Sequence, residues 1–205
     1  MENTKNISLW PIAAGAVAIF GIVYFVKKKQ RDDEDHAETQ QQVALIESEY
    51  EETAQNIGNN SNMASLAQQF YTAFNITRIN GQYVIGNFFS SASERQQFYD
   101  LAEQCTNLQD LMYYFNQLTD NKVPFLDAIT RSDLSDEGKK NTLNLLRVSK
   151  VVSNNNGTSL GVYKGIAQNG MVEVAHFEAN RFSADNWLDE RDLFNANNVT
   201  IVNPV

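Results

Sequence analysis

A run of twenty residues without a charged side chain, 7–26, constrains this chain more than any other feature. A helix rises about 1.5 Å per residue, so about 20 apolar residues are needed to cross a hydrocarbon core of about 30 Å. Trp10 and Tyr24 stand near the two ends of the run, where amphipathic rings prefer the membrane interface. Pro11 falls in the first turn of such a helix, where its missing N–H costs little. The pattern predicts a single transmembrane helix.

A cleaved signal peptide is the alternative interpretation of this segment. The apolar core of a signal peptide is about 7–15 residues long and follows a positively charged stretch. Here the basic residues come after the apolar run, as a collar of Lys27, Lys28, Lys29 and Arg31. An uncleaved anchor over 1–31 is therefore favoured, with the C-terminal body on the cytoplasmic side. For a virion with an internal membrane, the topology of the parent membrane would apply instead.

Small residues within the run predict one face for close helix packing. Ala14 and Ala18 form a small-xxx-small pair, and Gly21 adds a further small side chain. The plainer explanation is that alanine and glycine are common in membrane helices.

The charge of the chain is uneven along its length. Net charge is −9, and nine acidic residues with no Lys or Arg fall between positions 32 and 52. This predicts an acidic stalk over 32–62, partly helical from about 38 to 56, that acts as a solvated spacer and allows self-association. A nucleic-acid-binding surface would need clustered Lys and Arg, so nucleic acid is not an expected partner.

Residues 63–149 carry the periodicity of a helical bundle. Met63, Leu66, Phe70 and Phe74 recur at the spacing of one apolar helix face. Further helices are expected over 83–89, after a capping box at Ser93 and Gln96, and after Asn107, Pro124 and Ser135.

A resemblance to a known family rests on the helical region alone. The residues that carry it are Ala67, Phe70, Tyr71, Ala73, Phe74, Asp110, Leu111, Tyr114, Phe115, Phe125, Leu126 and Ile129. Over 63–148 they resemble a single annexin-like repeat of five short helices. Annexin calcium sites need a Gly-x-Gly-Thr loop, and here that place reads Arg78-Ile79-Asn80-Gly81-Gln82, so calcium-dependent lipid binding is not implied. The layout also resembles small anchored proteins of Bacteroidetes-type bacteria and their lipid-containing phages.

The pattern changes to short strands in 150–205. Runs over 160–167 and 171–177 are joined through Gln168-Asn169-Gly170, a strong hairpin signal. Two more short strands are expected near Trp187 and over 199–202, which predicts a small SH3-like barrel or sheet. The fold class is therefore α+β, with an N-terminal transmembrane helix, an acidic stalk, a helical bundle and a small β domain.

Residue types that could carry chemistry are few. The single cysteine, Cys105, lies on an apolar helix face and excludes a disulfide framework. His36 falls in the stalk, and His176 is expected to be a half-exposed strand residue rather than a ligand. The acidic cluster over 185–192 lacks the spacing of an EF-hand loop, so a solvated loop is favoured over a calcium site. No cofactor and no metal are expected.

These features together predict a non-enzymatic, single-pass membrane protein that scaffolds a larger assembly. Its partners would be a lipid bilayer, through 7–26, and proteins of the assembly. The leading version is a virion protein that links an internal lipid membrane to the capsid, with a bacterial envelope adaptor as the alternative. The rival class is an anchored enzyme that acts on the cell wall through a β-barrel targeting module.

Overall fold

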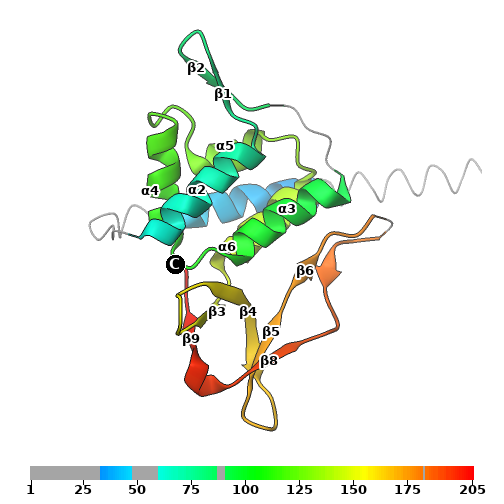
Figure 1. Ribbon diagram of the computed structural model, residues 1–205. Coiled ribbons are helices and arrows are strands. Elements are labelled where there is room, and N and C mark those ends of the chain that lie inside the picture. Colours follow the sequence, from blue (N-terminus) through cyan, green and yellow to red (C-terminus); the bar gives the residue numbers. More distant parts are fainter. Residues whose placement is uncertain (1–32, 48–59, 87–90, 182) are drawn as a thin grey trace, which may run out of the picture.

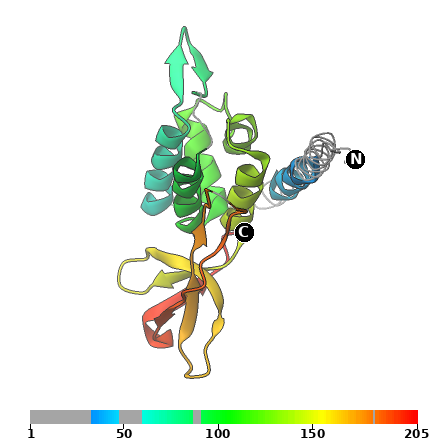
Figure 2. The ribbon, with the colours of Figure 1, turned by 90° about the vertical axis from the view of Figure 1, so that its right-hand side faces the viewer.

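The computed structural model describes residues 33–47, 60–86, 91–181 and 183–205, which form a helical layer and a β layer (Figure 1). One helix covers 33–47. The remaining helices are α2 (Ser61–Ala73), α3 (Ala92–Glu103), α4 (Leu108–Leu118), α5 (Phe125–Arg131) and α6 (Asp136–Arg147). Figures 1 and 2 both place the helical layer on one side and the strands of the C-terminal region on the other.

The β layer is an antiparallel sheet of five strands in the order β8-β5-β4-β3-β9. Its members are β3 (Lys150–Ser153), β4 (Ser159–Ile166), β5 (Val172–Ala175), β8 (Asp192–Phe194) and β9 (Val199–Val202). A second antiparallel pair, β6 (Phe177–Glu178) and β7 (Asn186–Trp187), lies under α3 (Figure 1). The α+β class is confirmed, but no barrel closes in the described residues, because β8 and β9 remain edge strands.

Side-chain caps explain where the helices begin. Asn60, Asn107 and Ser135 each accept a hydrogen bond from the backbone N–H three residues later. The predicted capping box lies two residues earlier than expected, at Ser91 and Glu94, because Glu94 returns a bond to the Ser91 N–H.

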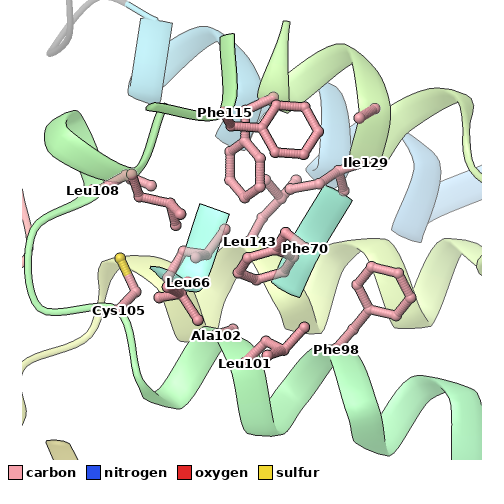
Figure 3. Packing of buried hydrophobic residues seen from close by; sticks show 14 of the residues in the cluster. Leu66, Phe70, Phe98, Leu101, Ala102, Cys105, Leu108, Phe115, Ile129 and Leu143 are labelled. Carbon is pink, nitrogen blue, oxygen red and sulfur yellow. The ribbon is translucent and has the colours of Figure 1, made fainter. Parts of the chain in front are cut away.

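The core of the helical layer is aromatic. Phe70 of α2 contacts Phe125 edge-on with ring centroids 5.1 Å apart, and Phe115 contacts Phe125 at 5.0 Å. Figure 3 shows Phe70, Phe98 and Phe115 converging from three different helices. These side chains are fully buried, so each contributes about 3–5 kcal/mol on the scale of aromatic-to-alanine substitutions.

The helix predicted over 83–89 is wrong where the structure describes it. Residues 77–84 form a hairpin of β1 (Thr77–Ile79) and β2 (Gln82–Val84) that projects from the helical layer away from the sheet (Figures 1 and 2). The turn at Asn80 and Gly81 has positive φ at both residues, the geometry of a two-residue hairpin turn. The short apolar run did not distinguish a helix from a strand.

The predicted transmembrane anchor lies outside the described residues, together with Trp10, Pro11, Ala14, Ala18, Gly21, Tyr24, Lys27, Lys28, Lys29 and Arg31. Among the helices that the structure describes, none combines the length and the apolar character needed to span a bilayer. We therefore correct the prediction of a single-pass membrane protein and of its membrane location, which the structure does not support.

Candidate binding groove along helix α3

Three adjoining hollows follow the exposed side of α3 and share residues at their borders. Gln69 of α2 lines the first and second hollows, and Asp100 lines the second and third. Gln104 and Ser159 line both the first and the third. We call the three hollows together the α3 groove.

Most side chains that line the α3 groove are uncharged and polar. The polar lining residues are Asn62, Ser65, Gln69, Ser93, Gln96, Gln97, Asp100, Glu103, Gln104, Thr106, Thr158, Ser159 and His176. The first and third hollows have volumes of about 210 Å³ each, and the second has a volume of about 390 Å³. Sites that enclose a small molecule have volumes of roughly 300–1,000 Å³, so two of the hollows fall below that range and the second lies at its lower end. A row of three small adjoining hollows suits an extended chain better than one enclosed small molecule.

Helix α3 presents the groove because its two faces differ in chemistry. Phe98, Leu101 and Ala102 are buried in the core. Ser93, Gln96, Gln97, Asp100 and Gln104 recur at helical spacing on the other side, so they line the groove together.

Gln96 of α3, which lines the groove, is hydrogen-bonded to the backbone at strand β6. Its Nε2 donates to the Phe177 carbonyl at 3.0 Å and to Asp100 Oδ1 at 2.8 Å. Its Oε1 accepts from the Ala179 N–H at 2.8 Å. Strand β6 is therefore held against α3 by a side chain that satisfies its backbone groups.

At one end of the groove, Glu103 and His176 form a close pair. Glu103 Oε2 lies 2.7 Å from His176 Nδ1, and Oε1 accepts from the Phe177 N–H at 2.6 Å. His176 Nε2 lies 3.6 Å from Asp192 Oδ2. Burial raises the pKa of the Glu103 carboxyl, although the hydrogen bonds from His176 and Phe177 oppose that shift. The pair is thus an oriented imidazole with a buried carboxylate behind it.

Gly161 of β4 makes room for this imidazole. A Cβ at position 161 would lie 2.7 Å from both His176 Cε1 and Val174 Cγ1. The backbone there has φ +124°, which side-chain-bearing residues rarely adopt. Only glycine leaves the ring in its place without strain.

A buried ion pair lies between α3 and the residues that precede β7. Arg95 donates to both oxygens of Asp185, at 2.8 and 2.9 Å, and the Tyr99 hydroxyl donates to the same carboxylate at 2.5 Å. Burial alone would raise the pKa of Asp185, but these bonds and that from the Asn180 N–H hold it below its usual value. The loop before β7 is therefore locked onto α3.

Lys150 and Cys105 are both fully buried, and electrostatic interaction couples them to each other. The Lys150 amine donates to the carbonyls of Leu145 and Val148, at 2.5 and 2.7 Å, at the C-terminal end of α6. Burial lowers its pKa to about 8, while electrostatic interactions with Cys105 and Glu103 act in the opposite direction. Burial raises the pKa of the Cys105 thiol to about 12, which agrees with the prediction of an inert core cysteine.

The structure places His176 and Asp185, the other residues singled out from the sequence, in two different sets of contacts. His176 is half-exposed, as expected, and lies between β5 and β6. Asp185 belongs to the Arg95 ion pair. Within the described residues, no three His, Cys, Asp or Glu side chains gather to hold a metal ion.

The α3 groove itself was missed from sequence. Its signal was the helical spacing of amide side chains from Gln96 to Gln104. The Glu103–His176 pair joins residues 73 positions apart, so no local pattern could have revealed it.

Comparisons of this chain with protein-family models, with curated proteins and with solved structures found no match. The annexin-like resemblance of 63–148 therefore stays a prediction.

Proposed function

We propose that the protein is a non-enzymatic scaffold that holds an extended polypeptide segment of a partner in the α3 groove. The observation that carries the proposal is that amide and hydroxyl side chains line three adjoining hollows between α2, α3 and β4. Side-chain amides both donate and accept hydrogen bonds, so they can pair with the N–H and C=O groups of an extended peptide that runs in either direction along the groove.

The charge of the groove supports a protein partner over a nucleic acid. Among the lining residues, the ionisable groups are Asp100, Glu103 and His176. A phosphate backbone needs Lys or Arg for counterion release, and these residues do not supply it. A virion and a bacterial envelope complex are the two assemblies in which such a scaffold would act.

The test compares two double variants with the same change in charge. Gln69→Arg with Gln97→Arg places two long cations in the groove, whereas Gln68→Arg with Gln117→Arg adds them to other exposed positions of α2 and α4. Affinity capture from cells that make the protein should recover one partner with the wild type and with the control pair. The groove pair should lose that partner, and equal recovery by both pairs would refute the proposal.

An enzyme is the second candidate, favoured by the Glu103–His176 pair. A buried carboxylate that holds one ring nitrogen leaves the other able to accept a proton, as in acid–histidine pairs of hydrolases. The test is incubation of purified cell-wall polymer with wild type and His176→Gln. Release of soluble fragments by the wild type alone would favour the enzyme, and no release by either favours the scaffold.

A further inference from the structure

One end of the α3 groove is acidic. Asp100 lines the second and third hollows, and Glu103 lines the third. Gln96 Nε2 donates to Asp100 Oδ1, and no other donor of the described residues reaches Oδ2, so this exposed carboxylate is open to a partner. Glu103 is buried, with one carboxylate oxygen on the Phe177 N–H and the other on His176. The accessible acid of the third hollow is therefore Asp100.

The backbone of α3 favours a positive charge at the same place. Aligned peptide dipoles put partial negative charge at the C-terminal end of a helix, where cations are stabilised. The third hollow lies at that end, because Glu103 is the last residue of α3 and Gln104 is its C-cap. The last turn of α3 contains no Lys or Arg. The carboxylates and the end of the helix thus favour the same kind of ligand.

Two lysines interact electrostatically with Glu103, but neither lines the groove. The Lys150 amine is fully buried and donates to two backbone carbonyls at the end of α6. The Lys164 amine lies 3.0 Å from the centre of the Trp187 ring. A basic side chain from another molecule would therefore reach Asp100 without displacing a lysine from the groove.

The first hollow, next to the acidic one, is partly apolar. Its lining includes Met63 and Leu66, each 2% exposed, among amide and hydroxyl side chains. It borders the third hollow through Gln104 and Ser159, which line both. A chain that places a cation at Asp100 would thus bring a neighbouring side chain against apolar surface.

We propose that the segment held in the α3 groove carries a Lys or Arg that pairs with Asp100 at the C-terminal end of α3, together with a nearby apolar side chain that packs on Met63 and Leu66. The inference rests on the proposed function and specifies the partner by its chemistry. An exposed ion pair adds little affinity, so the cation selects and orients the segment while the apolar contact contributes most of the binding.

Peptide selection on the full chain tests this chemistry. A display library of random peptides is selected on the wild type, on Asp100→Arg and on Asp133→Arg, which alters an exposed carboxylate between α5 and α6. The wild type and Asp133→Arg should enrich peptides that combine Lys or Arg with an apolar residue, whereas Asp100→Arg should enrich Asp or Glu in place of the cation. Because both variants change the net charge equally, the control accounts for nonspecific attraction of basic peptides to an acidic protein.

The affinity of the selected peptides measures the contribution of the pair. Asp100→Asn, which keeps the shape of the side chain, should weaken binding about threefold to fivefold, the effect expected of an exposed ion pair. Asp100→Arg should weaken it by more than about tenfold, because repulsion replaces attraction.

The groove variants distinguish the two proposals. Peptides that bind the wild type and the control pair at Gln68 and Gln117, but not Gln69→Arg with Gln97→Arg, occupy the groove. If such peptides show no enrichment of Lys or Arg, or bind Asp100→Arg as well as the wild type, the inference is overturned while the groove proposal stands. If the selected peptides bind both pairs of variants equally, or if no peptide is selected, both proposals fail.

Discussion

At the residue scale, the buried amine of Lys150 gives the fold a specific dependence on pH. Its pKa is lowered to about 8 in the folded protein, against about 10.4 for an unperturbed lysine. Between these values the unfolded chain binds more protons, so the contribution of Lys150 to stability rises with pH. The contribution of Cys105 to stability falls as pH rises, because the pKa of its thiol is raised to about 12 in the folded protein.

Replacing Cys105 isolates the pH dependence that Lys150 gives to the stability of the fold. In a Cys105→Ala background, the free energy of unfolding should rise by about 1–2 kcal/mol between pH 8 and 9.5 because Lys150 loses its proton more readily when folded. Adding Lys150→Met should flatten the curve. Urea unfolding followed by circular dichroism measures both, and parallel curves would contradict the burial of the amine.

Asp185 is the second residue with a defined thermodynamic role. Replacing it by Asn leaves the Arg95 guanidinium without its buried counter-charge, which costs about 3–5 kcal/mol in comparable pairs. Because the folded pKa of Asp185 is depressed, its contribution is present above the unfolded value of about 3.9 and is lost as pH falls below it. Asp192→Asn, at a largely exposed carboxylate, serves as the control and should change stability little.

At the scale of elements, strand β4 carries two glycines that differ in what an added side chain would meet. Substituting each one in turn distinguishes the effect of backbone strain from the effect of a steric clash. Gly161 and Gly165 both have positive φ, but an added Cβ meets His176 only at Gly161 and finds open space at Gly165. Gly161→Ala should therefore displace the imidazole and reduce partner capture, whereas Gly165→Ala should show the cost of strain alone. Nuclear magnetic resonance of His176 reports the displacement, and identical spectra for the two variants would contradict it.

The elements also show what sequence can and cannot predict. Helices α2, α4 and α6 follow from periodic apolar residues and a capping side chain, which are local signals. The β1–β2 hairpin was missed because three-residue strands carry too little pattern, and its position depends on Asp120, whose carboxylate accepts from the Tyr83 hydroxyl at 3.0 Å. The α3 groove, the Arg95–Asp185 pair and the buried Lys150 depend on how the two layers meet, which no short segment encodes.

At the scale of the whole molecule, hydrogen bonds join the helical layer to the β layer. The Ser159 hydroxyl donates to the Glu103 carbonyl at 2.6 Å, and the Leu108 N–H donates to the Pro204 carbonyl at 2.8 Å. Both contacts tie the β layer to the ends of helices, and the first lies at the α3 groove. The groove is therefore formed by the joined layers and keeps its shape only while they stay together.

Site-specific photo-cross-linking shows whether the α3 groove holds a partner chain. A photoreactive amino acid is placed at Gln97 in the groove and, in a separate full-length chain, at the exposed Gln117 of α4. Mass spectrometry after irradiation in the producing cells then identifies the attached peptides. We expect position 97 to attach to one continuous segment of a single protein and position 117 not to do so. Equal labelling from both positions, or no protein attached at position 97, would contradict the account.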